Sequence, residues 1–412
     1  MLVICLAVLR VLNVRFLFIK TPSEAVHQLK KVGVDTYGIE AMVTKMNSIN
    51  LFLEGVECKV ANILKQEMLS VGGDVAVSRG SVDCSVDRTD AIIIGTVKQQ
   101  RQLAEKITVQ PFGLKNIAQT IQILLDNFVR TTFLLTTPER EITLGEKTLV
   151  MGIVNATPDS FSDGGMFRNV DEAVEYGLTL EDEGANILDI GGESTRPGSE
   201  PVSAEEEMSR ILPLLRVLRR QLTIPISVDT TKAVVARAAI AEGAEIINDI
   251  SALRFDENMT EVAVSAGVPV IMMHMRGTPK IMQEGNLAYD SLIGEIIQFF
   301  DEEMSTAQSR GLKKENIVID PGVGFGKSYE DNLRLIRHLE EFKTLGMPIC
   351  IGTSRKGFVG ATTGGEPQER LEGTAATVTA AIMNGAHIVR VHDVESIKKV
   401  TLMADAIARV SG

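Results

Sequence analysis

The 412-residue chain carries 54 acidic and 42 basic residues, which gives a formal net charge of −12. This acidic balance argues against a surface adapted to nucleic acid, so any anionic ligand must be held by local groups. The four cysteines, Cys5, Cys58, Cys84 and Cys350, are scattered without CxxC pairing. They predict neither a disulfide framework nor a zinc site, and they favour a reducing cytoplasm.

The N-terminal run MLVICLAVLRVLNVRFLFI has the apolar composition of a signal peptide but not its other features. No basic stretch precedes it, Arg10 and Arg15 interrupt it, and no small-residue cleavage site follows. The run is also too short and too charged to span a bilayer. We therefore expect neither export nor a membrane segment, and we interpret the run as a buried strand of the first domain or as the result of a start codon assigned too early.

The length of the chain predicts two domains, residues 1–140 and 141–412. The first domain mixes strand-like and helical runs, so it is either α/β or α+β. A helix with a polar tail is expected near its end, between Gln110 and Glu141. No function follows from the sequence of this domain, and a docking, regulatory or dimerisation role stays open.

Eight apolar runs between Leu149 and Asp393 each end in a polar cluster and alternate with amphipathic helical stretches. Short apolar runs separated by helices predict a parallel sheet. Eight such units in roughly 250 residues suit a closed (β/α)8 TIM barrel of the α/β class better than an open sheet. Functional residues of such barrels lie at the carboxyl ends of the strands, so the polar clusters are the candidate site.

The first two clusters are loops that can close over a ligand. NATPDSFSDGG places Asn155 at the end of a strand and continues into a segment rich in Gly, Ser and Asp, which predicts a mobile lid. DIGGESTRPGS brings Thr195 and Arg196 next to glycine amides, a combination that suits an anion or a polar ring.

Three later strand ends carry side chains that suit a nitrogen heterocycle. Asp229, Asn248 and Asp320 stand where apolar runs should simply end, and Lys356 follows in TSRKG. Two carboxylates and a carboxamide can read a ring with adjacent N–H donors and a carbonyl. A guanidine-like pyrimidinone would pair its donors with Asp320, while the Lys356 ammonium could bond its carbonyl or ring nitrogen.

The last strand predicts an anion site. HIVRVHD sets Arg390 and His392 two residues apart, so both point to the same face of the strand. An unpaired charge is costly in the packed interior, so the pair should line the barrel mouth, where a diphosphate could bind. An ordinary hydrogen-bonding role for His392 stays open, and His274 is expected to be structural.

The segment DPGVGFGKS nearly matches a phosphate-binding P-loop, but Pro321 stands where the first glycine of that motif belongs. Its glycines are therefore expected to shape a loop that carries Phe325 and Lys327 past the pocket.

From about Thr148 to Gly412 the chain resembles the dihydropteroate synthase family, through NATPDSFSDGG, DIGGESTRPGS, SVDTTK, INDIS, MMHMRGTP, DPGVGFGK, TSRKG and RVHD in that order. The resemblance implies a barrel enzyme that joins 4-aminobenzoate to 6-hydroxymethyl-7,8-dihydropterin diphosphate, releases diphosphate with the help of Mg²⁺, and pairs as a homodimer. Minimal members of the family lack the first domain.

The resemblance also assigns roles to individual residues. It implies pterin binding by Asp229, Asn248, Asp320 and Lys356, packing on the pterin by Met273, contact with Mg²⁺ by Asn155, binding of diphosphate by Arg390 and His392, and a frame for aminobenzoate made of Phe161, Ser162, Thr195, Arg196, Pro197, Phe325, Ser354 and Lys356. We expect diphosphate to leave in a dissociative step, with Asp163 as a candidate to stabilise the resulting pterin cation and loop closure to exclude water.

Other functions stay open at this stage. A pterin-dependent methyltransferase uses a related barrel but has no use for a diphosphate site. A modified pathway could replace aminobenzoate by another arylamine. A non-catalytic pterin-binding protein would have its main role in the first domain.

Overall fold

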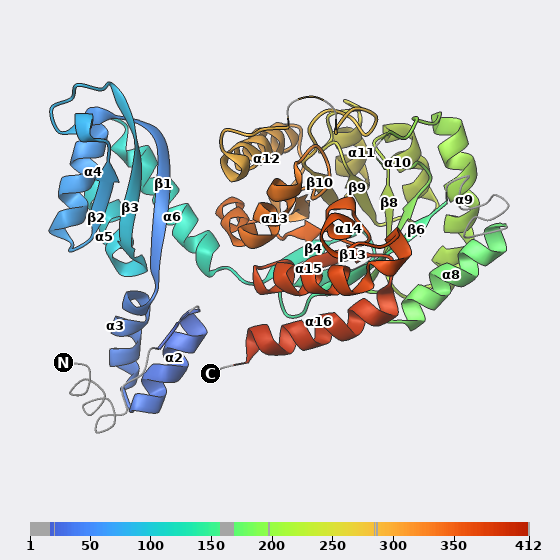
Figure 1. Ribbon diagram of the computed structural model, residues 1–412, viewed down its shortest axis with the longest axis horizontal. Helices are drawn as coiled ribbons and strands as arrows, with labels where there is room; N and C mark the ends of the chain where they lie inside the picture. The colour runs from blue at the N-terminus through green and yellow to red at the C-terminus, as the bar shows by residue number, and fades with distance from the viewer. Residues whose placement is uncertain are drawn as a thin grey trace. The chain divides into compact units, whose positions relative to one another are not determined.

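The computed structural model describes residues 17–19, 21–156, 169–196, 198–283, 285 and 287–410. The described chain forms two compact units, one up to Val129 and one from Arg130 to Arg409 (Figure 1). None of the described helices is long and apolar enough to cross a membrane.

The first unit is an α+β fold, which settles the choice that the sequence left open. Its described strands form a three-stranded antiparallel sheet in the order β1-β3-β2. Alternate residues of β3, such as Ala91 and Ile93, are buried against the helices. A capping box between Thr96 and Gln99 begins α5. The elements are α2 (Pro22–Val32), α3 (Thr36–Met46), β1 (Ser48–Glu57), α4 (Cys58–Ser70), β2 (Asp74–Val77), η1 (Arg79–Ser81), β3 (Arg88–Thr96), α5 (Val97–Ile107) and α6 (Leu114–Val129).

The second unit is the predicted (β/α)8 barrel, and this prediction is confirmed. Among the described residues, eight strands pair in the order β11-β10-β9-β8-β7-β6-β13-β12, and a parallel bridge between Ile319 and Ile349 joins the two ends of the sheet. The strands are β6 (Leu149–Asn155), β7 (Ile187–Gly191), β8 (Ile226–Asp229), β9 (Ile246–Asp249), β10 (Val270–Met273), β11 (Ile317–Asp320), β12 (Cys350–Ile351) and β13 (Ile388–Val391).

Helices follow the strands and cover the outside of the barrel (Figure 1). The side chain of Ser203 accepts a hydrogen bond from the Glu206 amide at the start of α9, and Arg219 and Arg220 lie in its last turn, where cations suit the helix dipole. The remaining elements are α8 (Val170–Asp182), α9 (Ala204–Gln221), α10 (Ala233–Ala241), α11 (Met259–Ala266), α12 (Leu292–Ser309), η2 (Lys314–Asn316), α13 (Tyr329–Arg337), η3 (Leu339–Leu345), α14 (Gly357–Thr363), η4 (Pro367–Glu369), α15 (Leu371–Met383) and α16 (Val394–Arg409).

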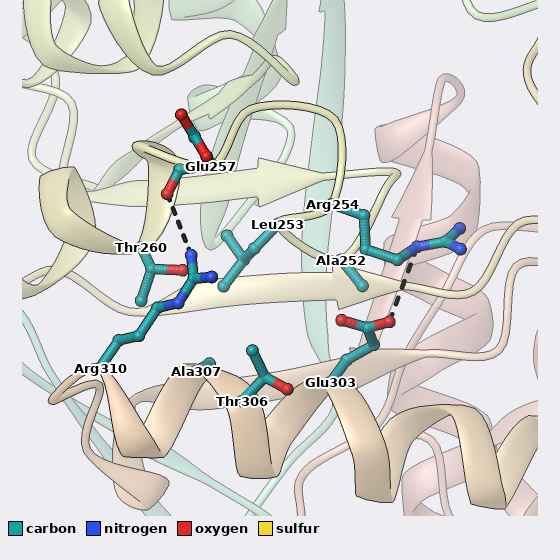
Figure 2. A pocket seen from close by; sticks show the side chains of 9 residues that line it. All are labelled: Ala252, Leu253, Arg254, Glu257, Thr260, Glu303, Thr306, Ala307 and Arg310. Carbon is teal, nitrogen blue, oxygen red and sulfur yellow. Dashed lines mark hydrogen bonds and ion pairs between the residues drawn. The ribbon is translucent and has the colours of Figure 1, made fainter.

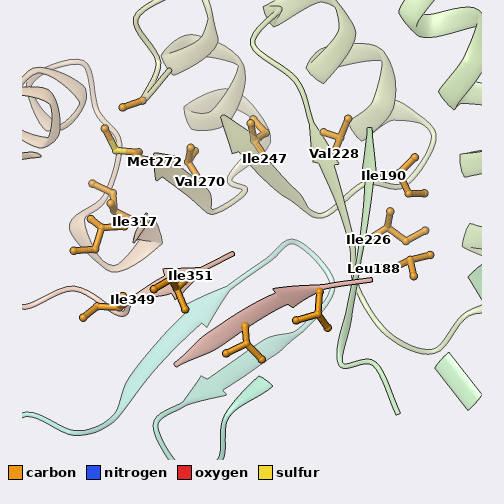
Figure 3. Close-up of a cluster of buried hydrophobic side chains, with 14 of the residues drawn as sticks. Leu188, Ile190, Ile226, Val228, Ile247, Val270, Met272, Ile317, Ile349 and Ile351 are labelled. Atoms are coloured by element: carbon orange, nitrogen blue, oxygen red, sulfur yellow. The ribbon is translucent and has the colours of Figure 1, made fainter. Parts of the chain in front are cut away.

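Successive residues of most barrel strands pack into two different cores. One set, which includes Leu188, Val228 and Met272, packs between the strands and the helices (Figure 3). The alternate set, which includes Ile187 and Ile271, forms a separate cluster on the inner side. Both faces of these strands are apolar in this part of the barrel, so the strand sequences are continuous runs of apolar residues.

A hairpin packs against this inner cluster ahead of the first barrel strand. Its strands are β4 (Phe133–Thr136) and β5 (Glu141–Leu144), and Phe133, Leu135 and Leu144 are buried in the inner cluster. The Phe133 ring also meets His387 edge to face, with ring centroids 5.1 Å apart. The sequence indicated a polar tail here and a barrel domain from residue 141, whereas the compact unit begins at Arg130. The hairpin therefore belongs to the barrel.

Candidate active site

The inner faces of the strands change from apolar to polar toward their carboxyl ends. Two residues after Ile187, Ile246, Val318 and Ile388 of the inner cluster, and two after Ser227 of β8, the same faces carry a polar layer made of Asp189, Asp229, Asn248, Asp320 and Arg390. Asp229 pairs in register with Asn248 across β8 and β9, and Asp320 pairs in register with the apolar Met273 across β11 and β10. The fold thus brings side chains from five strands to one end of the barrel.

Arg390 is the centre of this polar layer. Its Nε donates to Asp189 Oδ2 at 2.6 Å, and its Nη2 donates to Asp229 Oδ2 at 2.7 Å. The Asn248 Nδ2 also donates to Asp189 Oδ2, at 3.1 Å. Asp189 is fully buried, and its Oδ1 has no hydrogen-bond partner among the described residues. One guanidinium thus holds two carboxylates in fixed positions, with one carboxylate oxygen left to accept a further donor.

Burial makes the charge of Asp229 sensitive to pH. Burial raises the pKa of Asp229 to about 7; the Arg390 guanidinium opposes this rise, while the neighbouring carboxylates, Asp189 first among them, add to it. The pair with Arg390 favours the ionised carboxylate, and proton uptake would weaken that pair. Asp229 therefore titrates in the neutral range.

Asp320 and Lys356 form the other half of the layer. The Gly322 amide donates to Asp320 Oδ1 at 2.7 Å. Burial raises the pKa of Asp320, against the effect of the Lys356 ammonium. Burial likewise lowers the pKa of Lys356 to about 8, against the effect of Asp320. Lys356 Nζ donates to the Val323 carbonyl and lies 4.7 Å from the centroid of the Phe325 ring, a cation–π contact.

Lys327 lies beside the polar layer, where it interacts with the charges of Asp320 and Lys356. Its side chain is buried, and its Nζ lies 2.9 Å from His274 Nδ1. Nζ also donates to the carbonyls of His274, at 3.3 Å, and Phe325, at 3.0 Å. Burial lowers the pKa of Lys327 and of His274. Lys327 thus ties the Phe325 loop to the segment after β10.

His392 is neutral over most of the pH range. Its Nδ1 lies 3.0 Å from Ser354 Oγ, which also accepts from the His392 amide at 3.2 Å. Burial, with Arg355 and Arg390 nearby, lowers the pKa of His392 to about 3. His392 can therefore offer an anion a hydrogen bond but no charge.

An apolar cluster stands beside the polar layer. Met273 is buried together with Ile250, Met275 and Met282, and Phe325 packs against them. Thioether and aromatic side chains suit the face of a flat ring, whose polar edge the neighbouring carboxylates can then reach.

The structure brings together many of the residues that the sequence singled out. Asp229, Asn248, Asp320, Lys356 and Arg390 are linked by hydrogen bonds or by their mutual effects on pKa. The loop residues Phe161, Ser162, Asp163 and Pro197 lie outside the described residues.

Three predicted residues lie at the edge of this group. Asn155, at the end of β6, is half-buried and pairs in register with Gly191 of β7. Arg196 is exposed in the loop after β7, where its carbonyl accepts from the Ser199 amide at 3.0 Å, and Thr195 beside it is half-buried.

Asp189 is the site residue that the sequence reading missed. Asp189 lies inside the apolar run ILDIG rather than after its end, and the sequence prediction rested on polar residues at the ends of such runs. Side chains alternate between the two faces of a strand, so Asp189 shares the inner face with Ile187, as Arg390 does with Ile388. This alternation could have identified Asp189 from the sequence.

A separate cavity of about 180 Å³ lies between α11 and α12 (Figure 2). Arg310 Nη1 donates to the Glu257 carbonyl at 3.2 Å, and Arg254 lies 4.0 Å from Glu303. None of the predicted site residues lines this cavity, whereas the polar layer of the barrel contains Asp229, Asn248, Asp320 and Arg390 and is therefore the candidate active site.

Comparison with known proteins agrees with this assignment. The family described as "Pterin binding enzyme" matches residues 151–392. A dihydropteroate synthase from Synechocystis sp. is 49% identical over 267 residues, covering 64% of this chain and 92% of the relative. The structure of Xanthomonas albilineans dihydropteroate synthase with 4-aminobenzoic acid is 42% identical, with a TM-score of 0.63, and covers 68% of this chain and 100% of that one.

A third relative extends the match beyond the barrel. A probable bifunctional folylpolyglutamate synthase/dihydropteroate synthase from Haloferax volcanii is 37% identical over 350 residues, covering 82% of this chain and 41% of the relative. The matched 82% of this chain is longer than residues 130–409, so part of the first unit is matched as well. By its motifs, its barrel and its relatives, the chain belongs to the dihydropteroate synthase family of pterin-binding enzymes.

Proposed function

We propose that the polar layer of the barrel binds 6-hydroxymethyl-7,8-dihydropterin diphosphate and transfers its pterinylmethyl group to 4-aminobenzoate, with release of diphosphate, in folate biosynthesis. The observation that carries the proposal is the convergence of Asp229, Asn248 and Asp320 with Lys356 and Arg390 at one end of the barrel. The membership of the family supports the same reaction.

The pterin ring would lie against Met273 with its polar edges toward the strand ends. Asp320, held by the Gly322 amide, would accept from the guanidine-like donors of the ring, and Lys356 would donate to its carbonyl or ring nitrogen. The free Oδ1 of Asp189 and the carboxylate of Asp229 offer further acceptors.

The diphosphate would lie toward Arg390 and His392. As the C–O bond breaks, negative charge builds on the departing oxygens, where the Arg390 guanidinium and a hydrogen bond from neutral His392 would stabilise it. The aromatic amine then attacks the exocyclic carbon and loses a proton. Asp163 remains the candidate to stabilise a cationic pterin, and Phe161, Thr195, Arg196, Pro197, Phe325 and Ser354 remain the proposed frame for aminobenzoate.

Asn155 is the proposed protein contact of Mg²⁺. The described residues contain no group of three or more His, Cys, Asp or Glu side chains placed to hold a metal. A contact with one Asn is compatible with Mg²⁺, which commonly takes few protein oxygens and completes its shell with water and substrate phosphate. When bound, Mg²⁺ would neutralise part of the diphosphate charge.

The test is diphosphate release from the pterin diphosphate with 4-aminobenzoate and Mg²⁺. We expect turnover that Lys356→Ala slows at least ~10²-fold, since it removes a charge-assisted contact. Lys399→Ala, whose side chain is 72% exposed on α16, should leave turnover unchanged. Absence of release with any divalent metal would instead favour a non-catalytic pterin-binding protein, and preference for a different arylamine would redefine the second substrate.

We also propose that the chain forms a homodimer and is located in the cytoplasm. Leu402, Met403 and Ile407 expose apolar surface on α16, which would suit a second copy of the chain. We expect a dimeric mass by light scattering, reduced to that of a monomer by Met403→Glu. The scattered cysteines of the sequence, without CxxC pairing, support the cytoplasmic location.

A further inference from the structure

Two cysteines that are distant in the sequence meet in the first unit. Cys58 is the first residue of α4, and Cys84 lies in the connection between β2 and β3, 26 residues later. Their Sγ atoms are 2.8 Å apart. Since a disulfide bond is about 2.05 Å long, only a small side-chain movement separates this contact from a covalent link. The spacing of the cysteines in the sequence, which lacks a CxxC motif, predicts no such pairing.

Neighbouring polar groups hold the two thiols in place. Cys58 Sγ donates to the Ser81 carbonyl at 3.0 Å, and Cys84 Sγ lies 3.8 Å from the same oxygen. Asn62 Nδ2 donates to this carbonyl at 2.6 Å and lies 3.8 Å from each sulfur. The amide can therefore donate to either sulfur when it becomes a thiolate, and the shared carbonyl keeps both side chains turned toward each other.

The two thiols differ in their access to solvent. Cys58 is 4% exposed, whereas Cys84 is exposed. The hydrogen bond with Cys84, together with burial, raises the pKa of Cys58 to about 11, so Cys58 stays a thiol at neutral pH. A dissolved reagent can reach Cys84, and Cys58 can then react only with its neighbour.

We propose that Cys58 and Cys84 form a reversible dithiol–disulfide pair, oxidised by a small disulfide of the glutathione type. The Cys84 thiolate attacks one sulfur of the small disulfide and releases one thiol, leaving a mixed disulfide. In the mixed disulfide Cys84 is no longer a free thiol, so its contribution to the raised pKa of Cys58 is removed; Cys58 then loses its proton and attacks Cys84 Sγ, which releases the second thiol. Two electrons pass to the small disulfide, and the two cysteine protons end on the two released thiols.

A metal site fits these residues less well. Among the described residues, no third His, Cys, Asp or Glu side chain joins the two sulfurs in a group that could hold a metal. A covalent link would instead fasten the connection between β2 and β3 to the start of α4, and it would close a loop across the first unit.

The test is peptide mapping of the full chain after incubation in glutathione buffers, acid quenching and alkylation. Trypsin should release residues 46–59 and 80–88 joined by one disulfide, two hydrogens lighter than the separate peptides. Dithiothreitol should separate them. Cys58→Ser should leave only a glutathione adduct on Cys84, and Cys84→Ser should abolish the link.

A matched variant guards against other pairings. Cys5→Ser removes the remaining cysteine of the first unit's sequence and should leave the linked peptides unchanged. Mainly glutathione adducts on Cys84 of the unmodified sequence, or a Cys84–Cys84 link between two chains, would overturn the proposal.

Discussion

Burial lowers the pKa of Lys356 and raises the pKa of Asp229, so the two values lie close together. Lys356, at about 8, loses its charge as the pH rises, and Asp229, at about 7, loses its charge as the pH falls. Both site charges are therefore present together only near neutral pH. We expect kcat/KM to follow a bell-shaped pH profile with its maximum between these two values.

Lys356→Arg should move the alkaline limb of this profile beyond the measurable range, because a guanidinium stays charged. The measurement is kcat/KM for the pterin diphosphate from about pH 5.5 to 10 in both forms. An alkaline limb that persists unchanged in Lys356→Arg would show that another group causes it.

Lys327 should matter for stability, since it is a buried donor shared by three acceptors. Lys327→Ala leaves His274 Nδ1 and the His274 and Phe325 carbonyls without this donor. We expect a loss of about 1–3 kcal/mol in the free energy of unfolding, measured with urea. The exposed Lys313→Ala should change it by less than about 0.5 kcal/mol. Equal effects of the two substitutions would contradict the account.

The site could be predicted from sequence where a polar residue ends an apolar run. Asp229, Asn248 and Asp320 are of this kind. The contact of Arg390 with Asp189 could not be predicted in this way, because Asp189 lies within its run and the contact joins β7 to β13, far apart in the chain. The inward turn of Lys327 depends on packing around His274, to which no spacing in the sequence points.

At the scale of elements, the hairpin before the barrel should contribute measurably to stability. Leu135→Ala removes a side chain that is 1% exposed within the inner cluster, and about 2–5 kcal/mol of unfolding free energy should be lost. Leu134→Ala, on the opposite face of the same strand at 44% exposure, is the control and should cost less than about 0.5 kcal/mol. Similar losses at both positions would mean that β4 does not pack as described.

The elements themselves were predictable to different degrees. The barrel strands were anticipated because apolar runs and helices alternate regularly. The hairpin was missed because FLLTTPEREITL has short, mixed runs after a helix, and only its contact with the strand interior identifies it as part of the barrel. The sheet of the first unit was undecided because strand direction depends on pairing partners that are far apart in the chain.

For the whole molecule, the two compact units predict where the chain can be cut. A fragment that starts at Arg130 should fold and release diphosphate, because it keeps the hairpin and the barrel. A fragment that starts at Glu141 should be less stable, since it lacks β4 with Phe133 and Leu135. Thermal unfolding and turnover of both fragments provide the check, and equal stability would contradict the role of the hairpin.

The paired state of Arg390 has a consequence for product departure. Two carboxylates already serve as its counter-ions, so a small free anion gains little by displacing them. Sulfate should accordingly be a weak competitor, and product inhibition by diphosphate without Mg²⁺ should be slight. The same ion pairs keep the guanidinium in position after the pyrophosphoryl group leaves, so the site should be ready for the next substrate without rearrangement.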